Sequence, residues 1–129
     1  DFVHRAFRDK FIVLFESHFK RNYIHVRDVV GAFNHGIENF DSMKGNIYNV
    51  GLSTANISKL DLCERIKLQI PEFTIVQEKV GTDPDQRDYI VSNDKIEKTG
   101  FATKHTIDDG IRELLSGYKT FKMFNHGNV

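Results

Sequence analysis

The sequence predicts a single α/β domain, and three observations lead to this class. Short runs of β-branched and aromatic residues alternate with longer segments whose apolar residues recur at helical spacing. Such alternation is typical of α/β proteins. A chain of 129 residues, 40% of them hydrophobic, supports one core and contains no internal repeat or linker. We therefore expect residues 1–129 to form one domain of short mixed strands and three to four helices.

The first part of the chain contains two predicted strands and one predicted helix. Residues 10–15, KFIVLF, form a continuous apolar run, which favours a strand buried on both faces. Residues 22–26, NYIHV, are a shorter strand candidate. A helix is expected from Asp28, which is a good N-cap residue. Its apolar stripe at spacings near 3.6 residues consists of Val29, Val30, Phe33, Ile37 and Phe40.

The middle of the chain contains a third strand, a capped helix and a fourth strand. Residues 46–50, NIYNV, have the composition of a strand. Ser58 caps the next helix, with Asp61 three positions later, and Pro71 ends it. Residues 73–80, FTIVQEKV, then predict another strand.

The last part contains a short strand over residues 89–93, a helical turn that ends at Gly100, and the most regular helix of the chain. Thr106 is the predicted N-cap of that helix. Its apolar face consists of Ile107, Ile111, Leu114, Leu115 and Tyr118. Residues 122–129 show no period, and we expect them to be a frayed tail.

Composition and charge exclude several classes of protein. The 18 Lys and Arg residues balance 18 Asp and Glu residues, so we expect neither nucleic acid nor anionic lipid as a partner. Every apolar run is shorter than the roughly 18 residues that a membrane span needs. The only cysteine, Cys63, has no partner for a disulfide or a thiolate metal site within one chain, and a reducing cytoplasm is the expected location.

Motifs of a catalytic, metal or cofactor site are mostly absent from the chain. The nine glycines are scattered and form neither G-x-G-x-x-G nor a P-loop. The six histidines form no H-E-x-x-H motif, so we expect no metal site. Residues 118–122, YKTFK, match the proton-transfer motif Y-x-x-x-K, but Tyr118 lies on an apolar helix face, which favours packing. We expect no catalytic residue in this chain.

Charged residues gather at two junctions between loops and predicted strands. Lys20 and Arg21 precede NYIHV, while Asp83, Asp85 and Arg87 precede YIVSN. The planar guanidinium group of arginine suits a diphosphate, and a nearby aspartate can accept hydrogen bonds from ribose hydroxyls. The alternative is a set of solvated surface charges.

Four segments, in order, resemble the extended short-chain dehydrogenases, in particular the NAD-dependent nucleotide-sugar epimerases and dehydratases. RNYIHVRDV resembles the family's R-D-[YF]-[IV]-[HY]-V-x-D-[VL] segment, and YNVGLSTANISKLDL resembles its Y-N-x-G strand with the capped helix that follows. DPDQRDYIVSNDKIEKTGF is similar to R-P-x-D-x-x-x-Y-x-x-D-x-x-K-x-x-x-x-x-G, and TIDDGIRELLSGY to the closing helix. Together the four segments cover nearly all of residues 2–121.

The resemblance implies that the chain is the C-terminal, substrate-binding portion of such a Rossmann-type enzyme. In the family, the glycine-rich loop that binds NAD or NADP and the catalytic Tyr-x-x-x-Lys lie upstream of these segments, which agrees with the missing motifs. Residues 46–50 would be a strand of the parent's Rossmann sheet. The chain also begins without Met, in a helix-like pattern at residues 2–7, so we expect it to be the end of a longer protein.

The resemblance also assigns substrate-binding residues. Arg21 matches the family arginine that contacts the nucleotide diphosphate. Asp85 and Tyr89 match acidic and aromatic positions near the ribose. The strand whose end lies along the nucleobase in the family carries Val13, Leu14 and Phe15.

Two departures from the family pattern affect this site. The arginine of R-P-x-D falls on Thr82, and Arg87 is the candidate replacement for its diphosphate contact. The loop before Arg21 reads ESHFK, where the family has a glycine-containing loop, and this change can alter the base preference.

Three functions remain open at this stage. The chain is the nucleotide-sugar binding part of an NAD-dependent epimerase or dehydratase, a freestanding nucleotide-sugar binding module, or a truncated remnant without activity. The sugar, the base, the reaction type and the oligomeric state, a homo-oligomer included, are not determined by the sequence.

Overall fold

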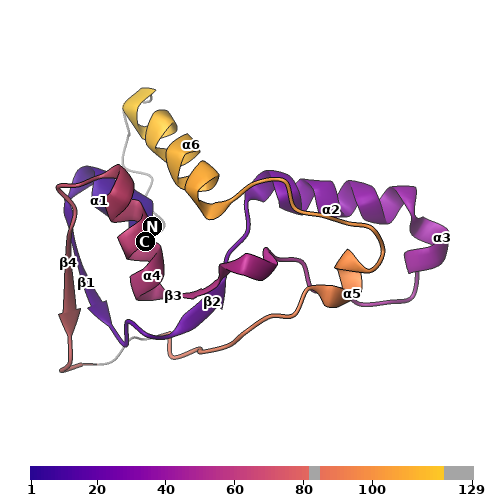
Figure 1. Cartoon of the computed structure of the whole chain (residues 1–129), viewed down its shortest axis with the longest axis horizontal. Coiled ribbons are helices and arrows are strands. Elements are labelled where there is room, and N and C mark those ends of the chain that lie inside the picture. The colour runs from indigo at the N-terminus through magenta and orange to yellow at the C-terminus, as the bar shows by residue number, and fades with distance from the viewer. Residues whose placement is uncertain (82–84, 121–129) are drawn as a thin grey trace.

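The structure, a computed structural model, describes residues 1–81 and 85–120 (Figure 1). Within these residues it confirms the mixed α/β class, with six α-helices rather than three to four. The additional helices are short ones at the start and middle of the chain. The elements are α1 (Phe2–Arg8), β1 (Phe11–Phe15), β2 (Lys20–Asn22), α2 (Val26–Glu38), α3 (Phe40–Met43), the 3-10 turn η1 (Ser53–Ala55), β3 (Asn56–Ser58), α4 (Lys59–Gln69), β4 (Thr74–Glu78), α5 (Asp94–Glu97) and α6 (Ile107–Thr120).

The strands form two separate pairs. β1 and β4 are parallel, with Phe11 opposite Thr74 and Phe15 opposite Glu78. β2 and β3 are antiparallel, with Arg21 opposite Ile57. The connection between β1 and β4 contains β2, β3 and several helices, as a parallel pair requires.

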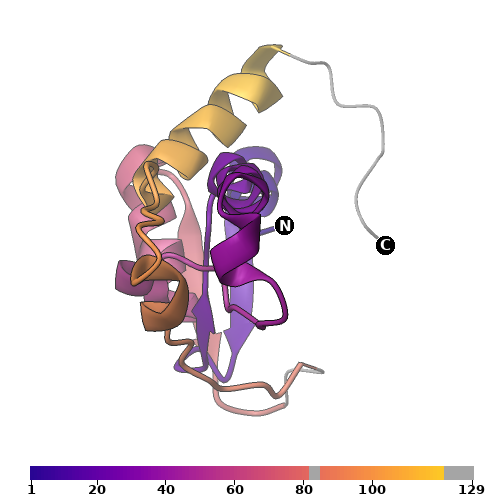
Figure 2. The same cartoon turned by 90° about the vertical axis from the view of Figure 1, so that its right-hand side faces the viewer.

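The main core lies between the β1–β4 pair and the helices α1, α4 and α6, while α2, α3 and α5 form a second group along the long axis (Figures 1 and 2). The buried members of the main core are Val3, Ala6, Ile12, Leu14, Leu62, Cys63, Ile66, Ile70, Phe73, Ile111 and Leu115. A smaller cluster in the second group consists of Ala32, Met43, Ile96 and Phe101.

The strand over residues 10–15 is buried on one face only, which corrects the sequence prediction. Ile12 and Leu14 are buried, whereas Phe11 and Val13 are exposed. Side chains alternate between the two faces of a strand, and the described helices cover one face of this pair.

The start of α2 also differs from the prediction. The segment 22–26 is not a strand beyond Asn22, and the N-cap is His25, whose Nδ1 accepts a hydrogen bond from the Arg27 amide at 3.2 Å. Asp28 lies inside the helix and is buried. Its carboxylate instead accepts hydrogen bonds from the amides of Lys104 and His105, each at 3.0 Å.

Two predicted strands, residues 46–50 and 89–93, pair with no strand among the described residues. Side chains hold both segments instead. Asn56 donates to the Val91 carbonyl and accepts from the Val91 amide, each at 2.9 Å. Lys95 donates to the Ile47 carbonyl at 3.0 Å. A strand needs a neighbour for its backbone groups, and side-chain contacts can replace only a few of these bonds.

The predicted N-caps of α4 and α6 are confirmed. Ser58 and Asp61 form a reciprocal capping box at the start of α4. Thr106 and Asp109 exchange the same two bonds at the start of α6, at 2.9 and 3.1 Å. Gly100, after α5, has the positive φ of +92° that favours glycine.

Asp83 and the tail 122–129 lie outside the described residues. In the part of the chain that the structure describes, no helix combines the length and the apolar character that a bilayer-spanning segment requires.

Candidate functional site

Arg21, the predicted diphosphate contact, lies on β2 with a side chain that is only 11% exposed. Its Nη1 donates to the Lys20 carbonyl at 2.8 Å, and its Nη2 donates to the Asp85 carbonyl at 3.1 Å. The same Nη2 lies 3.2 Å from the Asp85 carboxylate. The guanidinium carbon is 5.3 Å from the centroid of the Tyr89 ring. Residues separated by more than 60 positions therefore surround one guanidinium group.

Asp85 also forms a bidentate ion pair with Arg87. Arg87 Nε and Nη2 donate to the two carboxylate oxygens of Asp85, each at 2.6 Å. These bonds from Arg87 are the main cause that holds the pKa of Asp85 far below its ordinary value, and they raise the pKa of Arg87. Asp85 is thus a permanent anion between two guanidinium groups.

The segment after residue 84 runs beside β2 (Figure 1). The Lys20 amide donates to the carboxylate of Asp88 at 2.8 Å, and the Tyr89 amide donates to the Lys20 carbonyl at 3.4 Å. With Arg21, Asp85 and Arg87, this region carries three cations and two carboxylates. The local balance is one positive charge, in a chain whose overall net charge is zero.

The predicted base-contacting residues at β1 do not share one environment. Val13 is exposed, and the Phe15 ring packs against Gly81, where an added Cβ would come within 2.9 Å of the ring. Leu14 is 3% exposed and belongs to the main core. Alternation along the strand points the Leu14 side chain to the opposite face from Val13, and the contact of this strand with a base stays a prediction.

The structure brings Arg21, Asp85, Arg87 and Tyr89 together, as one site requires. Thr82, the position of the second family arginine, lies outside the described residues. Arg87 is close enough to act beside Arg21, although its side chain is 71% exposed and turned to Asp85.

One residue near this site was missed by the sequence analysis. Lys59, in the first turn of α4, is buried, and its Nζ donates to the Phe15 carbonyl at 2.6 Å. In the sequence it follows a helix cap, where a lysine is expected on the surface. No signal in the sequence distinguishes it from the other lysines.

Tyr118 of the YKTFK match packs between rings. Its ring centroid lies 5.4 Å from that of His4 and 5.7 Å from that of Phe7, at the edge of the main core. Lys122 lies outside the described residues. The packing interpretation of Tyr118 agrees with these contacts.

Three of the described cavities lie away from Arg21. A polar cavity of about 550 Å³ is lined by α2 and residues 100–105. An apolar groove of about 470 Å³ lies on α2 and α3, and a third cavity of about 240 Å³ lies between α1 and α6. Arg21 lines none of the three. Within residues 1–81 and 85–120, no group of three or more His, Cys, Asp or Glu side chains has the arrangement of a metal site.

No family model matches the sequence. Solved structures match nearly the whole chain at low sequence identity. dTDP-glucose 4,6-dehydratase from Bacillus anthracis, in complex with NAD, is 21% identical with a TM-score of 0.69, and the match covers 92% of this chain and 38% of that chain. UDP-glucose 4-epimerase from Thermotoga maritima, with UDP-glucose, is 20% identical with a TM-score of 0.71, over 92% of this chain and 38% of that chain.

A third match has a different substrate. L-threonine dehydrogenase from Phytophthora infestans is 13% identical with a TM-score of 0.77, over 92% of this chain and 40% of that chain. The three comparisons show that the chain has the fold of one part of the extended short-chain dehydrogenases, which confirms the resemblance at the level of the fold. The chain spans about two fifths of the length of these structures. Because the fold serves both nucleotide sugars and an amino acid, it does not choose between substrates.

Proposed function

We propose that this chain is the nucleotide-sugar binding part of a larger NAD-dependent or NADP-dependent enzyme of the epimerase and dehydratase class. In this proposal Arg21 binds the diphosphate, and a dinucleotide-binding half outside this sequence transfers the hydride. The observation that carries the proposal is the shielded guanidinium group of Arg21, held by Asp85 and Tyr89 with Arg87 beside it.

The arrangement suits a diphosphate for a physical reason. Two guanidinium groups already face one anion, the Asp85 carboxylate, at distances of 2.6 to 3.2 Å. Phosphate oxygens accept the same planar pairs of N–H donors. A bound diphosphate would take the place of the carboxylate between the two arginines and free Asp85 to accept hydrogen bonds from ribose hydroxyls.

The exposed end of β1 supports a place for the base. Val13 and Phe15 offer apolar contact surface, and no strand among the described residues pairs with the edge of β1 opposite β4. Holding the base and the diphosphate would orient the attached sugar, and binding energy from such remote groups lowers the barrier of a reaction elsewhere on the substrate.

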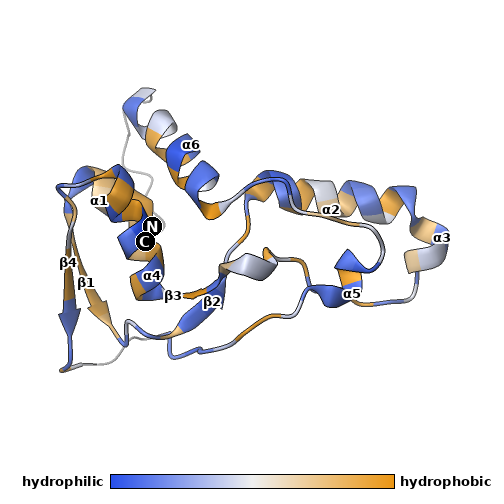
Figure 3. Cartoon of the chain, in the orientation of Figure 1, coloured by the Kyte–Doolittle hydropathy of each residue, from blue (hydrophilic) through white to orange (hydrophobic). Residues whose placement is uncertain are grey.

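The surface of α2 supports the existence of a covering half. The apolar stripe that the sequence predicts on α2 faces solvent in this chain (Figure 3). Four of its five members, Val30, Phe33, Ile37 and Phe40, are between 55% and 74% exposed, and Val26 at the start of α2 is 69% exposed. Contiguous apolar surface of this kind is rare in proteins that act alone.

The unpaired segment 46–50 lies beside that surface, since Tyr48 and Val50 line the same apolar groove as Phe33 and Ile37. In the proposal, this segment joins the sheet of the dinucleotide-binding half, and α2 packs on the face of that sheet. NAD or NADP would be held by that half. The described residues offer no glycine-rich cradle for it.

Titration calorimetry tests the proposal on the chain itself. The ligands are dTDP-glucose, UDP-glucose, CDP-glucose, GDP-mannose and L-threonine, and circular dichroism verifies folding. We expect saturable heat with at least one nucleotide sugar and none with L-threonine. Reading the gene upstream of Asp1 adds a second result. If no dinucleotide-binding half is encoded there and the chain binds a nucleotide sugar without redox activity, the chain is the freestanding module. Heat with none of the five, from a folded sample, would leave the remnant, and heat with L-threonine alone would contradict the proposed substrate class.

A further inference from the structure

A buried lysine contacts both ends of the loop that joins β1 to β2. Lys59 is 5% exposed, and its Nζ donates to the carbonyl of Phe15, the last residue of β1. The same ammonium group lies 5.2 Å from the ring centroid of Phe19, the residue before β2. Lysine is rarely buried unless its charge has partners, and these two contacts are among those that keep the side chain inside.

The position of Lys59 in its helix makes this burial more demanding. Lys59 is the first residue of α4, where the helix dipole disfavours a cation. Burial and the helix dipole are both unfavourable for a lysine at this position. An exposed side chain would avoid the cost of burial. The carbonyl of Phe15 and the face of Phe19 both favour the ammonium group in this position.

The loop itself is held by the start of the same helix. The amides of Lys59 and Leu60 donate to the carbonyls of Phe19 and Ser17, at 3.1 and 3.0 Å. These amides belong to the first turn of the helix, where backbone donors have no partner within the helix. Glu16 begins the loop at a φ of +47°, a left-handed conformation that is unfavourable for a residue with a side chain and must be enforced by its surroundings.

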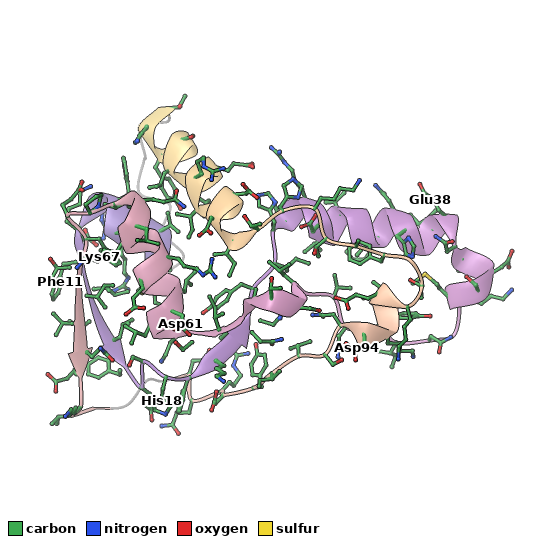
Figure 4. All side chains as sticks on the ribbon, viewed as in Figure 1. Phe11, His18, Glu38, Asp61, Lys67 and Asp94 are labelled. Atoms are coloured by element: carbon green, nitrogen blue, oxygen red, sulfur yellow. The ribbon has the colours of Figure 1, made fainter. Side chains whose placement is uncertain are left out.

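The loop sets the distance between the two parts of the proposed site. Phe15, the last residue of β1, lies before the loop and belongs to the proposed base-binding part. Arg21, the second residue of β2, lies after the loop and belongs to the proposed diphosphate-binding part. His18 lies in this loop, at the turn between β1 and β2 (Figure 4). A displacement of residues 16–19 would therefore change how far the Phe15 ring lies from the guanidinium group of Arg21.

We infer that Lys59 is a positioning residue that determines base selectivity: it holds the loop 16–19 and so sets the space between Phe15 and Arg21. The inference rests on the proposed function. In the proposed site, a purine and a pyrimidine would need different separations of these two side chains, because the two bases differ by a whole ring.

The test compares Lys59→Met with the wild-type chain and with Lys67→Met. Lys67 is an exposed lysine farther along α4, as Figure 4 shows, so it controls for the loss of a positive charge on the same helix. Hydrogen exchange reports on the amides of residues 16–20, and calorimetry with dTDP-glucose, UDP-glucose, CDP-glucose and GDP-mannose reports on selectivity. Phe19→Leu, which removes the ring beneath the ammonium group, replaces Lys59→Met should the latter fail to fold.

We expect Lys59→Met to speed amide exchange in the loop by about tenfold or more while the middle of α4 stays protected. We also expect the ratio between the weakest and tightest dissociation constants to shrink about tenfold. Lys67→Met should change neither quantity, and Lys59→Arg should restore part of both. Unchanged exchange in the loop, or an equal loss of affinity for all four ligands, overturns the inference.

The two failures are distinguishable. A wild-type chain that binds no nucleotide sugar defeats the proposed function, and the selectivity role of Lys59 is overturned with it, whereas the exchange measurement still decides whether Lys59 holds the loop. A wild-type chain that binds selectively, together with a Lys59→Met chain of equal selectivity, overturns the inference and leaves the proposed function intact.

Discussion

Asp28 and His105 join the start of α2 to the segment before α6. His105 Nδ1 lies 2.9 Å from a carboxylate oxygen of Asp28, which also accepts the amides of Lys104 and His105. The His105 ring stacks on the ring of His25, with centroids 4.5 Å apart, and His25 Nε2 lies 3.3 Å from the carboxylate of Glu113 on α6. A buried carboxylate thus connects the two groups of helices.

Replacing Asp28 by Asn should destabilise the chain by about 2 to 4 kcal/mol, because an amide cannot accept all three bonds and leaves buried donors unpaired. Urea unfolding at pH 7 measures this loss. Asp41→Asn is the matched control, since Asp41 forms an exposed pair with Lys44 and its loss should cost under about 1 kcal/mol. Equal effects of the two substitutions would show that Asp28 makes no special contribution.

The stability that Asp28 contributes should disappear in acid. Burial by itself raises the pKa of Asp28, but hydrogen bonds from Lys104 and His105 together outweigh it and hold the pKa below its ordinary value of 3.8. A carboxyl group whose pKa is lower in the folded than in the unfolded state stabilises the fold at any pH above its unfolded-state pKa. This contribution is lost as the pH falls through the folded-state pKa.

The difference in unfolding free energy between the wild-type chain and Asp28→Asn should therefore be constant from about pH 7 to 5 and shrink below about pH 4. Urea titrations at each pH measure it. The pKa of Asp109, lowered to about 2 by bonds from Thr106, gives the wild type and the variant the same additional loss, so it cancels in the difference. A difference that grows in acid would contradict the assignment.

Removing the guanidinium group of Arg21 should weaken nucleotide-sugar binding by about 1.5 to 3 kcal/mol, the usual contribution of a charge-assisted hydrogen bond. Calorimetry with Arg21→Ala measures the change, after circular dichroism has verified folding. Arg112→Ala is the control. Arg112 pairs with Asp109 on the exposed face of α6, so its removal should leave the dissociation constant unchanged. A dissociation constant unaffected by Arg21→Ala would remove Arg21 from the site.

Gly51 should tolerate no side chain. A Cβ at this position would lie 1.8 Å from Asn22 Oδ1 and 2.9 Å from Asn93 Oδ1, so Gly51→Ala should cost about 1 to 3 kcal/mol. Gly36 is the contrasting position, because it lies within α2 with nothing within 4 Å of an added Cβ. Gly36→Ala should raise the free energy of unfolding by about 0.5 to 1 kcal/mol. Thermal unfolding of both variants decides, and a stable Gly51→Ala chain would refute the crowding at Gly51.

Lys10 should be improved by glycine. It follows α1 at a φ of +59°, which costs a residue with a side chain about 1 to 2 kcal/mol, and its exposed pair with Glu72 offsets little of this. Lys10→Gly should therefore raise the unfolding free energy by about 0.5 kcal/mol or more. Lys44→Gly, at the φ of −54° after α3, should instead lower it. If Lys10→Gly and Lys44→Gly lower the unfolding free energy by the same amount, the backbone at Lys10 is not strained.

The sequence by itself determined the class of fold and the ends of two helices. The caps Ser58 with Asp61 and Thr106 with Asp109 were predictable because both partners lie three residues apart, so the geometry of one helical turn brings them together. The charged junctions at Arg21 and Asp85 were also visible as candidates, although spacing alone favoured a solvated surface.

Only the tertiary structure decided which groups meet. It placed Leu14 in the core, made His25 rather than Asp28 the cap of α2, covered Arg21 with Tyr89, and buried Lys59 against Phe15. Each of these facts except the cap depends on contacts between segments more than 40 residues apart. Local patterns record which residues a helix or strand prefers, but desolvation and charge pairing depend on what the rest of the chain brings alongside.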